Sequence, residues 1–134
     1  MGPHQLLNPP ALMDGAPFGY SQLGIAVPGR IVALAGQAAI RADGTPLGGA
    51  FEGQVGLAFE NVRLALAAAG CVPAHVIQLR IYVVGLVPAM IEPIKAALGR
   101  LFGPPGPPNA LIGVAALAFP ELLIEVEALA VRPD

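Results

Sequence analysis

The 134-residue chain is poor in charge, with a single cysteine and no tryptophan. Charged residues make up 12% of the chain, about half of the usual share in soluble proteins, whereas hydrophobic residues make up 55%. The length suits one domain with a real core, but so small a domain has too much surface to hide this apolar area alone. The composition therefore predicts burial between subunits, in a homo-oligomer.

Cysteine and histidine are too scarce for a disulfide or a metal cluster. Cys71 is the only cysteine, so no disulfide can form within the chain, which suits a reducing compartment. The two histidines, His4 and His75, lie far apart and have no ligand-like spacing to Cys71. We therefore expect a cytoplasmic protein with no metal and no cofactor.

The chain also lacks basic clusters and long uninterrupted apolar helices. Its formal net charge is −2, which does not favour a nucleic-acid partner. The longest stretch without a charge, residues 101–120, contains five prolines and cannot form a membrane-spanning helix. Residues 1–15 have no basic region before an apolar one, so we expect no secretory signal. We expect neither nucleic acid nor membrane as a partner.

Apolar periodicity predicts the order of the secondary-structure elements. Residues 20–27 and 30–37, joined by Pro28-Gly29, are typical of a β-hairpin. Helical spacing predicts two helices, one ending at Gly70 and one over about 89–102, with Pro93 in its first turn. Alternating apolar residues predict three further strands, at 75–84, 109–117 and 122–131.

The order β-β-α-β-α-β-β predicts one α+β domain over residues 18–134, preceded by a loosely ordered arm over residues 1–17. Both helices should cover the same face of the sheet. Strand alternation then predicts the side chains of the uncovered face, namely Gln78, Arg80, Tyr82, Asn109, Leu111, Glu125 and Glu127. Because no helix covers this half-polar face, we expect it to form the oligomer interface.

Six segments in this order resemble the RidA/YjgF family. They are "GYSQ" (19–22), "AGQ" (35–37), "GQVGLAFENVRLALAAAG" (53–70), "VIQLRIYV" (76–83), "PPNALIGVAAL" (107–117) and "IEVEALAV" (124–131). The resemblance implies a homotrimer with a chorismate-mutase-like fold and small-molecule ligands bound in clefts between adjacent subunits. It also implies hydrolysis of reactive enamines and imines, such as 2-aminoacrylate, without a metal.

Asn109 occupies the position at which active members of this family carry an arginine, in the loop Pro-Ala-Arg-Ser. That arginine binds the substrate carboxylate through two parallel hydrogen bonds, whereas an asparagine amide has no charge. Losing a charge-assisted pair costs about 2–5 kcal/mol when the partner stays buried. We therefore expect small α-keto and α-amino acids to bind poorly.

Other family positions divide into altered and retained ones. Ala35, beside Gly36, replaces a serine, and Leu111 replaces a cysteine. Tyr20 and Glu125 are retained, and the resemblance implies that Glu125 positions water or the substrate nitrogen. Glu125 is therefore the candidate catalytic residue. The candidate ligand-binding residues are Asn109, Tyr20, Ala35, Gly36, Leu111 and Arg80.

Several of these residues have a structural alternative. A guanidinium buried on the open sheet face needs a partner, and Arg80 has either a glutamate or an anionic ligand available. We favour an ion pair, with Glu127 as a structural partner. Tyr20 and Glu125 stay open between packing and function, and Asn61, in the middle of a helix, is expected to be structural.

Two functions follow from these residues. The first is a trimeric, specialised metal-free hydrolase or deaminase acting on an imine, an enamine or a related molecule. The alternative is a non-catalytic small-ligand-binding or accessory protein. The endoribonuclease activity reported for the family ranks low, because an acidic balance and 5% aromatic residues provide neither an electrostatic path nor a stacking platform for RNA.

Overall fold

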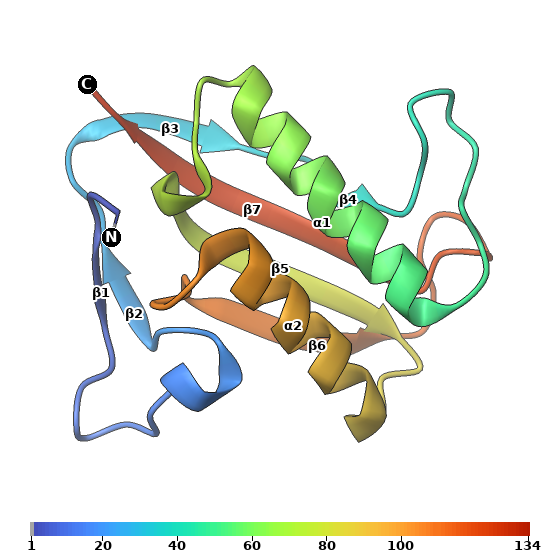
Figure 1. Cartoon of the computed structure of the whole chain (residues 1–134), viewed down its shortest axis with the longest axis horizontal. Coiled ribbons are helices and arrows are strands. Elements are labelled where there is room, and N and C mark those ends of the chain that lie inside the picture. The colour runs from blue at the N-terminus through green and yellow to red at the C-terminus, as the bar shows by residue number, and fades with distance from the viewer. Residues whose placement is uncertain (1) are drawn as a thin grey trace.

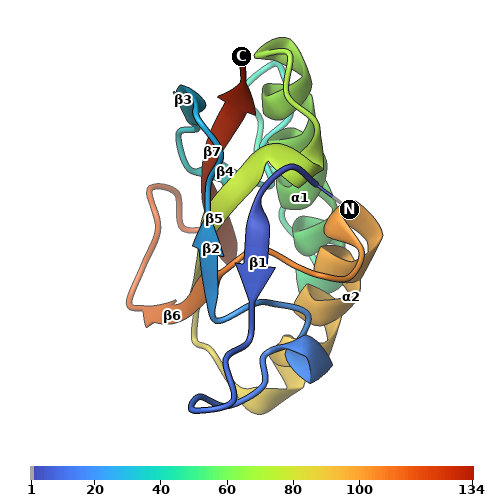
Figure 2. The same ribbon diagram turned by 90° about the vertical axis from the view of Figure 1, so that its left-hand side faces the viewer.

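The computed structural model describes residues 2–134 and shows two helices packed on one face of a mixed β-sheet (Figures 1 and 2). The strands of this sheet run in the order β3-β7-β5-β6, and β4 also pairs with β7. Their bounds are Gly29–Ala33 for β3, Gln37–Ala38 for β4, Val76–Val84 for β5, Asn109–Val114 for β6 and Ile124–Pro133 for β7. Strands β5 and β6 are parallel, whereas β7 is antiparallel to its three partners. The predicted α+β class and the position of both helices are confirmed.

The two helices are α1 (Phe51–Ala68) and α2 (Ile91–Phe102). Gly70 follows α1 with a φ of +70°, a left-handed conformation that ends a helix at little cost for glycine. Pro93 lies in the first turn of α2, as predicted, where its missing N–H has no intrahelical partner to lose. Three short 3₁₀ turns lie in the connections, namely η1 (Ala16–Phe18), η2 (Pro73–His75) and η3 (Pro88–Met90), and η3 leads directly into α2. Within residues 2–134, neither helix has the length and apolarity needed to cross a bilayer.

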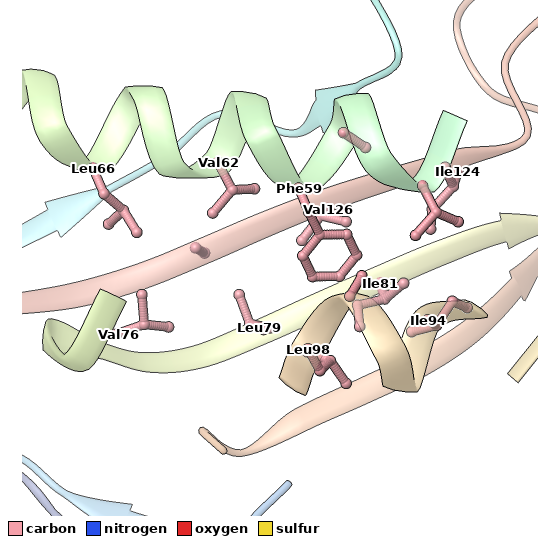
Figure 3. Packing of buried hydrophobic residues seen from close by; sticks show 14 of the residues in the cluster. Phe59, Val62, Leu66, Val76, Leu79, Ile81, Ile94, Leu98, Ile124 and Val126 are labelled. Atoms are coloured by element: carbon pink, nitrogen blue, oxygen red, sulfur yellow. The ribbon is translucent and has the colours of Figure 1, made fainter. Parts of the chain in front are cut away.

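The core lies between the helices and the sheet (Figure 3). Phe59, Val62 and Leu66 project from α1 at helical spacing, and each is almost fully buried. Leu79 and Ile81 project from β5 toward them. Each fully buried side chain of this size stabilises the fold by about 1.5–3 kcal/mol. The apolar faces predicted for α1 and β5 therefore form the core.

The predicted hairpin is wrong. Strand β2 (Leu23–Ile25) pairs with β1 (Gln5–Leu7), whereas β3 pairs with β7. The Pro28-Gly29 step turns the chain, but β7 offers β3 a run of five residue pairs that the short β2 cannot match. Part of the 1–17 segment thus forms a strand. His4 lies buried beside it, with Nε2 3.0 Å from the carbonyl oxygen of His75.

The predicted face of β6 is also wrong. In the parallel pair of β5 and β6, Asn109 lies opposite Leu79 and Leu111 opposite Ile81. Opposite residues share a face of the sheet, so Asn109 and Leu111 lie on the helix-covered side. The pattern of β6 could not show this, because both of its faces are apolar. The antiparallel register pairs Arg80 with Glu127 and Tyr82 with Glu125, which keeps these four residues on the open face as predicted.

Gln54 fastens α1 to the segment before β7. Its side chain is fully buried, and its Nε2 donates a hydrogen bond of 2.8 Å to the carbonyl oxygen of Glu121. Its Oε1 accepts a bond of 2.8 Å from the N–H of Leu123. Asn61 connects α1 to β4 and the residues after it in the same way. Its Nδ2 donates hydrogen bonds to the carbonyl oxygens of Ala38 and Ile40, both at 2.9 Å. The structural role expected for Asn61 is thus confirmed, and Gln54 provides a second set of hydrogen bonds between α1 and the rest of the domain.

We predict that Gln54→Ala lowers the free energy of unfolding by roughly 2–4 kcal/mol, because two partly buried hydrogen bonds and the packing of a fully buried side chain are lost. The measurement is urea denaturation at fixed protein concentration. Gln5→Ala, at an exposed position of β1, serves as the control and should change the unfolding free energy by less than about 0.5 kcal/mol. Equal effects of the two substitutions would contradict the assignment.

Candidate functional site

Asn109 lies at the wall of an apolar cavity of about 190 Å³ on the helix side of the sheet. The other lining residues come from the N-terminal segment, β5, α2 and β6; they are Met13, Phe18, Tyr20, Ile81, Ile91, Ile94, Lys95, Leu98 and Leu111. We call this space the Asn109 cavity. Met13 and Phe18 at its rim are 60% and 49% exposed. An apolar rim of this kind favours contact with an apolar ligand or with another chain.

The amide of Asn109 is not satisfied by the protein. Its Nδ2 atom is buried and has no hydrogen-bond partner among residues 2–134. A buried donor without a partner costs about 1–3 kcal/mol. The preceding residue is held in place, because the carbonyl oxygen of Pro108 accepts a hydrogen bond of 2.9 Å from the N–H of Leu79. The chain therefore fixes a polar group that lacks an acceptor at the wall of an otherwise apolar cavity.

The N-terminal segment positions Tyr20 against the same cavity. Asn8 organises this segment, since its Oδ1 accepts hydrogen bonds from the N–H groups of Gly15 at 3.1 Å and Gln22 at 3.0 Å. The ring of Tyr20 lies so close to Gly15 that a Cβ atom there would be 2.8 Å from ring atom Cε2. Among the described residues the Tyr20 hydroxyl has no hydrogen-bond partner, so the ring is packed while its polar end stays available.

Glu125, the candidate catalytic residue, lies on the opposite face of the sheet from Asn109. Its carboxylate lies directly against Gly36, where an added Cβ would be 2.6 Å from Cδ of Glu125. Ala35, next to Gly36, is exposed. Within residues 2–134 the half-buried carboxylate of Glu125 has neither an ion-pair nor a hydrogen-bond partner. Glu125, Gly36 and Ala35 thus form a second cluster, which we call the Glu125 cluster.

Arg80 makes the ion pair expected with Glu127, with 3.5 Å between Nη1 and Oε1. The hydroxyl of Tyr82 donates a hydrogen bond to the same oxygen of Glu127. This bond to a carboxylate is the main cause that raises the pKa of Tyr82 above its ordinary value. Glu127 therefore has a structural role on the open face, and a ligand-binding role for Arg80 stays a prediction.

The candidate residues thus fall into two groups within one chain. Asn109, Tyr20 and Leu111 meet around the Asn109 cavity, whereas Glu125, Ala35 and Gly36 meet on the open face. The sheet separates the two groups. Among residues 2–134 no three His, Cys, Asp or Glu side chains come close enough to hold a metal ion.

Lys95 also lines the Asn109 cavity, although it was not among the site residues predicted from the sequence. A signal was present, because Lys95 is the only lysine of the chain and stands within the apolar stripe of Ile91, Ile94 and Leu98 on α2. Residues at these spacings share one helix face, which here is the face turned toward the sheet. A lone cation in such a stripe is a candidate for a site residue.

Comparisons with known proteins agree with this architecture. A family model described as Endoribonuclease L-PSP matches residues 14–132. The crystal structure of YyfB from Yersinia pestis, a protein of unknown function of the conserved Rid family, is 38% identical, with a TM-score of 0.93 over 97% of this chain and 99% of that one. Rv2704 from Mycobacterium tuberculosis, of the YjgF/YER057c/UK114 family, is 26% identical, with a TM-score of 0.64 over 96% of this chain and 99% of that one. A search of curated proteins finds no match.

We predict that Tyr82 titrates above the ordinary tyrosine pKa of about 10 and that Glu127→Gln lowers its pKa toward that value. The hydrogen bond to the carboxylate stabilises the protonated phenol, and the substitution removes the negative charge. The chain has two tyrosines and no tryptophan, so ultraviolet absorbance follows their ionisation cleanly. Tyr82→Phe identifies the component that belongs to Tyr82. An unchanged titration in Glu127→Gln would contradict the prediction.

Proposed function

Because the chain belongs to the RidA/YjgF family, we propose that it binds a small organic molecule in a cleft between two copies within a homotrimer. The observation that carries this proposal is the Asn109 cavity, with its open apolar rim and its unsatisfied amide nitrogen. An enclosed structural contact would satisfy the amide from within the chain. A ligand, or a neighbouring chain together with a ligand, supplies the missing acceptor.

The separation of the two residue groups supports a shared site. One chain provides the Asn109 cavity, and the Glu125 cluster of an adjacent copy closes it, since no single chain can bring both to one place. The open face also has apolar area to cover, because Ile31 is 73% exposed and Leu129 is 36% exposed. Ile31 lies on this face, since it pairs with Val131, two residues beyond Leu129 on β7. Burial of this face between copies removes that apolar surface from water.

For the chemistry we propose metal-free hydrolysis of an imine-type substrate. The carboxylate of Glu125 accepts a proton from water while the water oxygen bonds to the imine carbon. The electron pair of the C=N bond moves to nitrogen, which takes up the proton from the Glu125 carboxyl. As the resulting carbinolamine collapses, its hydroxyl proton moves through Glu125 to nitrogen, the C–N bond breaks, and ammonia and the carbonyl product form. Asn109 and nearby backbone N–H groups stabilise negative charge that develops on the substrate.

A non-catalytic ligand-binding role is the second candidate. It is favoured by the absence, among residues 2–134, of any group that orients the Glu125 carboxylate by a hydrogen bond. The Glu125→Gln variant separates the two candidates. In an enzyme this substitution abolishes turnover and preserves ligand binding, whereas in a binding protein it leaves the measured function unchanged.

We predict that light scattering gives a mass three times the 13.6 kDa of the chain at micromolar concentration. Ile31→Glu should shift the protein toward monomers, because it places a charge on the apolar part of the face that the proposed trimer buries. Leu64→Glu is the matched control, since Leu64 is 50% exposed on α1 and lies away from the sheet. A monomer mass for the unmodified chain would refute the homotrimer.

We also predict little hydrolysis of 2-aminoacrylate, because Asn109 places no charge on the strand wall, where active members of the family carry the arginine that binds a small carboxylate. Asn109→Arg should raise this rate by at least about tenfold, the gain from one charge-assisted pair. Asn109→Gln, which lengthens the side chain without a charge, should not. The assay is ammonia release from enzymatically generated 2-aminoacrylate. A high rate in the unmodified protein would show that another group holds the carboxylate.

A further inference from the structure

Lys95 is a cationic residue on an otherwise apolar helix face, where its charge has no evident role in stabilising the fold. It lies in the second turn of α2, half-buried, on the helix face that carries Ile91, Ile94 and Leu98. Long cationic side chains usually extend to solvent from such positions and leave only the stem packed. Here the stem is held against η1, since Cγ of Lys95 lies 3.8 Å from the point where a Cβ of Gly19 would stand. Figure 2 shows the N-terminal segment next to α2.

The protein provides no carboxylate for this ammonium. Glu92 lies three residues earlier on the same helix, a spacing that permits an ion pair. The ion pairs among residues 2–134 nevertheless join Arg63 to Glu60 and Arg80 to Glu127, and neither involves Lys95. No carboxylate among residues 2–134 therefore neutralises the charge of Lys95.

Two cavities meet at Lys95. Besides the Asn109 cavity, a second space of about 190 Å³ lies between α2 and the Gly- and Pro-rich loop 103–106. Lys95 and Tyr20 line both spaces, and among residues 2–134 Lys95 is the only charged residue that lines either one. No acidic side chain of these described residues faces either space, so an anion entering there meets one positive charge and no repulsion from them.

We propose that Lys95 is the anion-binding residue of the Asn109 cavity, which selects a monocarboxylate with an apolar body. The assignment rests on the proposed small-molecule site and specifies its ligand class. An ammonium acts as a point charge with three donors, so it binds a carboxylate without the fixed planar geometry that arginine requires. Apolar walls lower the local dielectric and strengthen the attraction. A single cation matches a single negative charge.

The arrangement also sets the shape of the ligand. The cation lies on the helix wall, whereas Asn109 provides a neutral amide on the strand wall. Between them the surface is apolar, formed by Ile81, Leu111 and Phe18. A ligand that reaches Lys95 with its carboxylate therefore lays an aliphatic or aromatic body on this surface, and a second polar atom can accept a hydrogen bond from Asn109.

Paired probes test the charge directly, namely 3-methylbutyrate and phenylacetate against their neutral amides. Reductive methylation with ¹³C-formaldehyde labels Lys95 and the chain terminus alone, because the chain has no other lysine. Titration of the full-length oligomer, followed by NMR, gives the dissociation constants and shows whether the Lys95 signal moves. We expect each carboxylate to bind at least roughly tenfold more tightly than its amide, with a shift of the Lys95 signal.

Lys95→Met keeps an unbranched side chain, one atom shorter than lysine, and removes the charge, so it should abolish the preference for carboxylates while the amides bind as before. Arg100→Gln removes a cation from the same helix outside both cavities and should leave the preference intact. For these variants, unlabelled ligand-observed NMR measures the affinity. Equal binding of acid and amide to the unmodified protein, or a preference that survives Lys95→Met, overturns the proposal.

The outcomes also separate this proposal from the proposed function. If the amides bind and Asn109→Leu weakens them, but the acids bind no better, the small-molecule site stands and the role of Lys95 is refuted. If neither acids nor amides bind the oligomer, both are refuted for this ligand class.

Discussion

The pairing of β5 with β7 is the interaction on which the rest of the structure depends. The register sets Arg80 opposite Glu127 and Ile81 opposite Val126, so one alignment determines the faces of the side chains from Gln78 to Val83 and of their partners on β7. The apolar set lies under α1 and α2, while the polar set forms the network of Arg80, Tyr82 and Glu127 on the other face. A slip of one residue would exchange the two faces and bury these charges under the helices, at a cost the core could not offset.

The same register determines the geometry of the candidate site. Since β6 runs parallel to β5 with Asn109 opposite Leu79, the amide of Asn109 is carried to the helix side. Glu125, opposite Tyr82, is carried to the open side. In the proposed function these two groups are halves of one site, and a second copy of the chain joins them. Oligomerisation and ligand binding would then depend on the same open face.

The few ionic groups differ in whether the structure gives them a partner. Arg80 and Glu127 satisfy each other, and Arg63 pairs with Glu60 on the exposed surface of α1. Glu125 and Lys95 are left without such partners among residues 2–134, and each lies beside candidate site residues. In a domain that is 55% hydrophobic, an unpaired charge at a half-buried position interacts more strongly with other charges, and costs more free energy to leave unpaired, than the same charge on a polar surface. They are therefore the groups whose substitution is most informative about function.

The sequence by itself determined the elements whose pattern is local and repeated. Alternation along 76–84 separated Leu79 and Ile81 from Arg80 and Tyr82, and helical spacing marked Phe59, Val62 and Leu66 as core residues. Only the tertiary structure decided the features that depend on distant partners. In the structure β2 pairs with β1 rather than with β3, and Asn109 lies on the opposite face of the sheet from Glu125. The cavity beside Lys95 is likewise visible only in the structure. The physical reason is that periodicity indicates which residues of a strand or helix share a face. Which strand pairs with it, and which of its faces lies under the helices, depends on the alignment of segments far apart in the sequence. The favoured alignment buries the most apolar surface and satisfies the most backbone hydrogen bonds.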